Sequence, residues 1–225
     1  MTACYKADDY LYNVDEIMSN LSVEMNDSTL SANGVDSKVI TFKFPYNADD
    51  QLTDLLVIAS NGTFKESDND SIKVNFTKLD ATEKYKYSEV TFVSTASVSD
   101  CILRIEVLNH FMNDTIRFEN ARPVSIDVSS DIYFLKNDTI SEMTLGTTVL
   151  STNGVASSGQ KIVLSVNENV GFFNTNLVTS GSSGGANFKY VFTDTSFVGP
   201  LTFTAKTTTV NNDTISGSKT INIID

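Results

Sequence analysis

The chain has 225 residues, which is enough for one large domain or for two of ordinary size. Hydrophobic residues make up 40% of it and aromatic residues 10%, as in globular proteins, and the polar remainder is rich in Ser, Thr, Asn and Asp, which favour strands and turns. The 28 Asp and Glu residues outnumber the 16 Lys and Arg residues, and the resulting net charge of −12 argues against nucleic acid as a partner, since such a surface repels a phosphate backbone.

The first four residues, MTAC, resemble the end of a bacterial lipobox, in which small residues precede a lipidated cysteine. The segment that follows Cys4, YKADDYLY at residues 5–12, is acidic and is similar to the segment that directs some lipoproteins of Bacteroidota to the cell surface. This resemblance implies that Cys4 carries a lipid and that residues 1–20 tether the chain to either face of the outer membrane. The apolar spacing in residues 9–20 also allows a turn or two of helix. Because no run of about 18 apolar residues occurs, we expect the lipid to be the only membrane attachment.

Short alternating segments separated by Asn, Asp, Gly and Ser follow the tether. Residues 39–44 place Ile40, Phe42 and Phe44 on one face, and residues 55–59 (LLVIA) form a buried type of run. Alternation returns in residues 90–93 and 102–107. Strands of this kind suit a β-sandwich, in which each strand shows one face to the core and the other to water.

The second cysteine, Cys101, opens the apolar segment 101–108, and a buried free thiol is the simplest expectation for it. A disulfide with Cys4 is open as an alternative, although the spacing of the two residues gives no argument for it.

An internal repeat divides the sequence into two halves. The tetrapeptide NDTI occurs at residues 113–116 and 212–215, each time after an alternating strand, and we expect it at hairpin turns. Upstream, residues 90–93 correspond to 188–192, and residues 55–59 to 162–166. The segment NARP, which ends at Pro123, is the natural boundary, since proline is unsuited to a central strand. The predicted domains are residues 21–122 and 123–225.

Both halves resemble the bacterial immunoglobulin-like domains of invasin and intimin. The resemblance rests on LSANGVDSKVITFKF at residues 30–44, LVIASNGTF at residues 56–64, and the glycine turn with its following strands at residues 181–205. It covers about residues 21–225 and departs from the family at residues 49–54 and 65–71. It implies an all-β chain of two tandem immunoglobulin-like β-sandwiches, and a role as spacer, adhesin stalk or subunit of a complex.

The sequence does not favour an enzyme. His110, the only histidine, has no catalytic motif around it, and one histidine with two distant cysteines cannot form a hydrolytic triad or a zinc site. No glycine-rich loop follows a strand and opens a helix, so nothing indicates nucleotide binding.

Acidic loops are the candidates for a cofactor, and the cofactor they suit is calcium. The first group is Glu66, Asp68 and Asp70, and a second is Asp49, Asp50 and Asp54. Neither has the spacing of a known calcium loop, and solvated acidic loops are the alternative.

Two further surface features are predicted. Tyr85 and Tyr87 alternate onto one strand face beside Phe76 and could stack on a glycan, with core or edge packing as the alternative. A three-residue pattern, in which Asp is followed by Ser or Thr and then by an aliphatic residue or Thr, resembles the O-glycosylation acceptor of Bacteroidota. Turn formation is the structural alternative. The acceptors in this pattern would be Ser28, Ser71, Thr115, Thr139 and Thr214.

These observations favour a non-enzymatic lipoprotein of the outer membrane that binds another envelope protein or a surface ligand as a scaffold, adhesin-like module or accessory subunit. The alternative is a surface module that binds glycans for nutrient uptake. A glycan binder should expose aromatic side chains together, whereas a subunit should expose an apolar or strand-edge patch.

Overall fold

The computed structural model describes residues 18–46, 54–108, 110–209 and 211–225. Apart from helical residues at 18–20, the regular structure of these ranges is β-strand, which confirms the all-β prediction. No helix within them has the length and apolar character needed to cross a bilayer. Cys4, most of the predicted tether, Asp49 and Asp50 lie outside the described residues.

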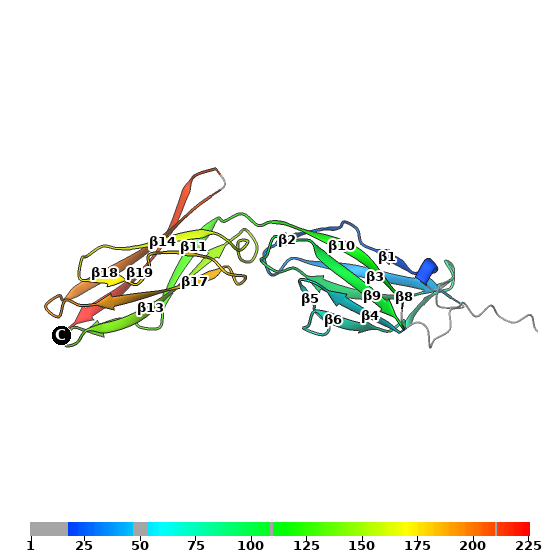
Figure 1. Ribbon diagram of the computed structural model, residues 1–225, viewed down its shortest axis with the longest axis horizontal. Coiled ribbons are helices and arrows are strands. Elements are labelled where there is room, and N and C mark those ends of the chain that lie inside the picture. The colour runs from blue at the N-terminus through cyan, green and yellow to red at the C-terminus, as the bar shows by residue number, and fades with distance from the viewer. Residues whose placement is uncertain (1–17, 47–53, 109, 210) are drawn as a thin grey trace, which may run out of the picture. The chain divides into compact units, whose positions relative to one another are not determined.

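The described residues form two compact units, each a pair of packed sheets (Figure 1). The second unit comprises Ser31–Val35, Thr95–Val98 and Asn120–Asp225, and the other described residues make up the first. One sheet of the first unit has the order β1 (Ser22–Glu24), β3 (Ser37–Pro45), β8 (Tyr85–Val93) and β5 (Thr63–Phe64), with β7 (Lys78–Asp80) also paired to β8. The other has the order β2 (Thr29–Ala32), β10 (His110–Asn120), β9 (Cys101–Val107), β4 (Leu55–Ala59) and β6 (Ser71–Val74).

The second unit repeats this plan. Its first sheet has the order β11 (Ser125–Ser130), β13 (Ser141–Leu150), β17 (Gly185–Phe192) and β15 (Gly171–Phe173). Its second sheet has the order β12 (Phe134–Lys136), β19 (Thr214–Ile224), β18 (Gly199–Thr208), β14 (Lys161–Val166) and β16 (Leu177–Thr179). Position by position, β8 corresponds to β17 and β4 to β14, as the sequence repeat predicts.

The repeated tetrapeptide NDTI, however, does not occupy equivalent places, so this part of the repeat was wrong. In the first unit Asn113 lies inside β10, opposite Arg104 of β9. In the second unit Asn212 lies in the turn between β18 and β19, with a positive φ of 64°, and the N–H of Thr209 donates to the Asp213 carbonyl at 2.8 Å. The prediction that the tetrapeptide makes a hairpin turn therefore holds only for the second copy.

In each unit, alternate residues along the strands point inward and fill the core between the two sheets. Ile40, Phe42 and Phe44 are all buried, as predicted. Cys101 is buried with a free thiol, as expected, and its burial raises the pKa of the thiol. The run at 55–59 alternates between buried and half-buried residues rather than being buried throughout. The core of the second unit consists mainly of aliphatic residues around Phe188, Tyr190, Phe192 and Phe203.

Candidate binding surfaces

The acidic residues proposed for calcium are not gathered in the structure. Glu66 turns toward β8, where its Oε1 accepts a hydrogen bond from the backbone N–H of Thr91 at 2.8 Å. Asp68 and Asp70 are exposed, and Asp68 has a positive φ of 54°. Across the part of the chain that the structure describes, no three His, Cys, Asp or Glu side chains come together in a way that could hold a metal ion.

Tyr85 and Tyr87 lie side by side on the outer face of β8, with ring centroids 5.9 Å apart. The ammonium groups of Lys43 and Lys78 lie 4.7 and 5.3 Å from the ring centroids of Tyr85 and Tyr87 respectively. Since the lysines already provide cation–π contacts to the half-buried rings, the packing alternative accounts for both tyrosines without a glycan.

The same two lysines are held by glutamates. Lys43 Nζ lies 2.5 Å from Glu24, and Lys78 Nζ lies 2.5 Å from Glu89. The hydrogen bond with the glutamate raises the pKa of each lysine. These contacts of the lysines with glutamates and tyrosines therefore link neighbouring strands of this sheet.

The proposed glycosylation acceptors are spread over both units. Ser28 precedes β2, Thr115 lies on β10, Thr139 follows β12 and Thr214 begins β19, and all four are exposed. Ser71, the first residue of β6, is half-buried, and its carbonyl accepts a hydrogen bond from Ser67 Oγ at 2.8 Å. Four of the five acceptors are thus open to solvent.

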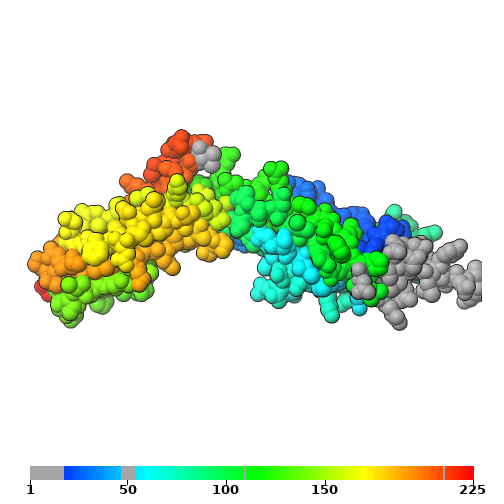
Figure 2. All heavy atoms as spheres, in the orientation of Figure 1, coloured from blue at the N-terminus to red at the C-terminus, as the bar shows by residue number. Residues whose placement is uncertain are grey.

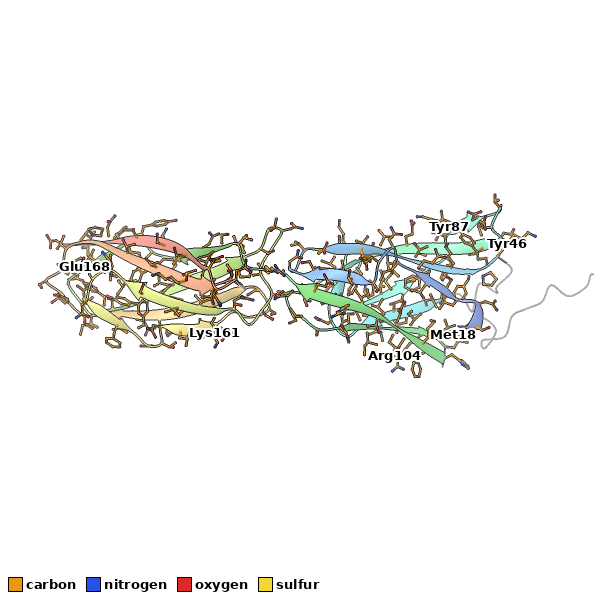
Figure 3. All side chains as sticks on the ribbon, turned by 90° about the horizontal axis from the view of Figure 1, so that it is seen from above. Met18, Tyr46, Tyr87, Arg104, Lys161 and Glu168 are labelled. Carbon is orange, nitrogen blue, oxygen red and sulfur yellow. The ribbon has the colours of Figure 1, made fainter. Side chains whose placement is uncertain are left out.

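An exposed apolar surface on β9 and β10 was not predicted. We call it the first-unit patch and define it as Ile102, Arg104, Leu108 and Phe111, of which the three apolar residues are 48%, 65% and 56% exposed in that order. The Arg104 guanidinium lies 4.3 Å from the centroid of the Phe111 ring, and its Nε lies 2.5 Å from Glu106. Figure 3 shows Arg104 and Tyr87 on opposite faces of the first unit.

A shallow hollow of about 300 Å³ borders this patch, lined by Arg104, Glu106, Leu108, His110 and Phe111. His110 is paired with Val107 at the first position of β10 and therefore belongs to a strand. Leu108 sits at the turn with a positive φ of 51°, which exposes its side chain. An aliphatic residue at a hairpin turn was the sequence signal that could have revealed the patch.

The equivalent face of the second unit is rich in hydroxyl groups. Cross-strand pairs between β18 and β19 include Thr202 with Thr220, Thr204 with Ser218, and Thr208 with Thr214. Two exposed lysines, Lys161 and Lys206, lie on the same face, and Figure 3 shows Lys161 at the surface of this unit.

No family model matches the sequence, and no curated protein matches it significantly. Among solved structures, the chain is similar to invasin, a bacterial integrin-binding protein, at 16% identity and a TM-score of 0.50, over 90% of this chain and 39% of invasin. It is also similar to the Yersinia pseudotuberculosis adhesin InvE, at 17% identity and a TM-score of 0.43, over 92% of this chain and 59% of that one. The D00-D0 domain of intimin matches at 13% identity and a TM-score of 0.37, over 91% of this chain and all of that one. The invasin match confirms the fold: two tandem immunoglobulin-like sandwiches.

Proposed function

We propose that this chain is a non-enzymatic module of the bacterial cell envelope that binds a partner protein through the first-unit patch. A lipid on Cys4 would hold it at the outer membrane, and the sandwiches would act as an adhesin-like scaffold or as an accessory subunit of an envelope complex. The observation that carries the proposal is the cluster of exposed apolar side chains around Arg104. The immunoglobulin-like fold is compatible with this role but does not specify it.

The composition of the patch suits a protein partner. Aromatic residues and arginine are enriched where protein interfaces gain most of their binding energy. Arg104 is already oriented by Phe111 and Glu106, so it loses little side-chain freedom when a partner binds. The patch lies on two paired strands, which provide a rigid support.

Photo-crosslinking in the native envelope tests this assignment. A p-benzoyl-phenylalanine in place of Phe111 should form a discrete adduct with one envelope protein on irradiation. The matched control is the same probe in place of Val39, which is 52% exposed on β3 in the other sheet of the first unit. The proposal fails if the Val39 position gives the same adduct, or if Phe111 gives none.

The lipid anchor needs a separate test. Cells fed an alkyne analogue of palmitate should label the protein on Cys4, and Cys4→Ala should abolish the label and release the chain from the membrane. Cys101→Ala is the control and should retain the label, because the thiol of Cys101 is buried in the first sandwich. Labelling that persists in Cys4→Ala would rule out this anchor.

A further inference from the structure

The outer face of β18 and β19 carries an extended set of hydroxyl groups. Outward positions on this strand pair are occupied by Ser or Thr everywhere between Thr202 and Thr220 except at Lys206, which pairs with Ser216. We call these hydroxyl residues the ladder, and they are Thr202, Thr204, Thr208, Thr214, Ser216, Ser218 and Thr220. In one cross-strand pair of the ladder, Thr202 Oγ1 and Thr220 Oγ1 share a hydrogen bond of 3.0 Å. Figure 2 shows the end of this hairpin, in orange and red, standing out from the rest of the second unit.

The charge of this sheet is unusual for so acidic a chain. The described strands β12, β14, β16, β18 and β19 contain four lysines and no Asp or Glu. Residues 120–225 contain six Lys and Arg against eight Asp and Glu, whereas residues 1–119 contain ten against twenty. An anionic ligand is therefore repelled mainly by the first half and is tolerated at this face.

Two of the four lysines frame a hollow beside the ladder. Val163 of β14 is opposite both Leu177 of β16 and Lys206 of β18, and Lys161 lies two residues before Val163 on the same face. The hollow has a volume of about 400 Å³ and is lined by Lys161, Val163, Leu177, Lys206, Thr207, Thr208 and Thr214. Figure 3 places Glu168, the acidic residue after β14, at the far end of the unit from Lys161. The hollow thus combines an exposed apolar floor with two ammonium groups.

The position of the ladder in the sheet limits what can bind there. Within the sheet, β14 pairs with residues 203–206 of β18 and β12 pairs with residues 222–224 of β19, so the backbone of these two segments is used by neighbouring strands. A ligand that lies on the face of the sheet contacts the outward side chains, and the paired segments are closed to an extended peptide that would add through its backbone. Hydroxyl side chains both donate and accept hydrogen bonds, which matches a ligand that is itself rich in hydroxyl groups.

We propose that this face binds an acidic polysaccharide. Lys161 and Lys206 contact carboxylate groups of the polymer, since charge-assisted hydrogen bonds are the strongest that the face can make. The ladder bonds to sugar hydroxyls along the strand direction, and Val163 and Leu177 contact an apolar C–H face of a sugar ring. This site is separate from the first-unit patch, and it assigns the glycan interpretation to residues other than Tyr85 and Tyr87.

Titration of the full chain with polygalacturonate and with hyaluronate tests the proposal. We expect saturable binding to at least one of them, and a loss of affinity of about tenfold or more in the double variant Lys161→Gln, Lys206→Gln. Lys136→Gln is the matched control, because Lys136 is an exposed lysine of the same sheet on the edge strand β12, and it should bind as the wild type does. Thr204→Val should weaken binding by a few-fold, as expected for the loss of one neutral hydrogen bond.

Several results would overturn the proposal. They are no binding to either polymer, equal binding by the double lysine variant, and equal binding to polyglutamate, which would show that carboxylates alone suffice. Binding of neutral dextran at the same affinity would also overturn it. Because these substitutions lie outside the first-unit patch, crosslinking from position 111 should persist in the double variant, so that failure here is distinguishable from failure of the proposed protein contact.

Discussion

The same pair of strands has opposite surface chemistry in the two units. In the first unit the outer face of β9 and β10 carries Ile102, Arg104 and Phe111. In the second unit the outer face of β18 and β19 carries serine, threonine and Lys206. Inward positions must fill a core, whereas outward positions are free to vary, because successive side chains of a strand point to opposite faces. A repeated fold therefore does not imply a repeated binding function.

The inward positions, by contrast, carry the same kind of aromatic packing in both units. Phe64 of β5 pairs with Phe92 of β8 at a centroid distance of 5.4 Å, and Phe173 of β15 pairs with Tyr190 of β17 at 4.9 Å, both edge to face. A side chain at Gly62 would lie 2.3 Å from the ring of Phe92. In the second unit, a side chain at Gly171 would lie 2.7 Å from the hydroxyl of Tyr190. Each sandwich thus contains an edge-to-face aromatic pair with a glycine packed against one of its rings.

Removal of the central ring is the most severe test of this equivalence. Phe92→Ala and Tyr190→Ala should each lower the free energy of unfolding of their own unit by about 3–5 kcal/mol, because each leaves a cavity in a packed core. Denaturation monitored by hydrogen exchange reads the two units separately. Phe111→Ala, at an exposed position, is the control and should change stability by less than about 0.5 kcal/mol. A small effect of either core substitution would show that the two cores are not equivalent.

A close approach found only in the second unit should give the next largest effect. A side chain at Gly217 of β19 would lie 1.9 Å from the carbonyl oxygen of Ile126 on β11. Counted from the core pairs Cys101–Ile116 and Leu201–Ile221, the equivalent residue of the first unit is Met112. We expect Gly217→Ala to destabilise the second unit by about 2–3 kcal/mol through backbone displacement.

Gly181→Ala is the matched control for this substitution. A side chain at Gly181 would meet its nearest atom at 3.8 Å, which is an ordinary contact. Its stability, measured by the same denaturation, should stay within about 0.5 kcal/mol of the wild type. If Gly217→Ala were equally mild, the crossing of β11 over β19 would be looser than the structure shows.

Exchanging the ring types at the two equivalent positions, Phe92 and Tyr190, tests the role of the tyrosine hydroxyl. The hydroxyl of Tyr190 is buried and has no hydrogen-bond partner among the described residues, and burial raises its pKa. Tyr190→Phe should therefore stabilise the second unit by about 1 kcal/mol. Phe92→Tyr should destabilise the first unit by about 1–3 kcal/mol, because it introduces an unpaired hydroxyl at the equivalent position. Thermal unfolding measures both, and a loss of stability in Tyr190→Phe would indicate an unrecognised partner for the hydroxyl.

Inward residues were predictable from the sequence because alternation has only one period in a strand. This is why Ile40, Phe42 and Phe44 were correctly assigned to the core, and why β8 and β17 were correctly matched. The place of NDTI was not predictable in the same way. Asn, Asp and Thr suit both a turn and an exposed strand face, so the identical letters at residues 113–116 and 212–215 did not reveal that one copy lies within a strand.

The candidate surfaces were harder to predict than the fold. The alternation of residues 102–107 puts Ile102 on the same face as Arg104, but only the pairing of β9 with β10 shows that Phe111 shares this face and that Leu108 lies at the turn. The ladder was hidden for a different reason. Its residues are separated in sequence by a turn, and they form one surface only when β18 and β19 pair through ten consecutive positions.

The smallest expected effect concerns two aspartates in turns, one in each unit, of which Asp27 is exposed and Asp194 is half-buried. Asp27 accepts hydrogen bonds from the hydroxyl and the N–H of Thr29 at 2.8 and 2.9 Å, and Asp194 accepts them from the hydroxyl and the N–H of Ser196 at 2.6 and 2.9 Å. These bonds, the hydroxyl bond first, lower the pKa of each carboxyl below its usual value of 3.8. Since the folded pKa is depressed, each aspartate stabilises the fold above pH 3.8, and this contribution is lost as the pH falls through the folded pKa.

Carboxyl chemical shifts measured by NMR between pH 2 and 6 should therefore give midpoints below 3.8 for both aspartates. Thr29→Val should raise the midpoint of Asp27 alone, and Ser196→Ala that of Asp194 alone, because each removes the hydroxyl bond that contributes most. The stability lost in either variant at neutral pH should vanish below the folded pKa of its aspartate. A midpoint that did not move in either variant would mean that the turn in that unit is held by its backbone alone.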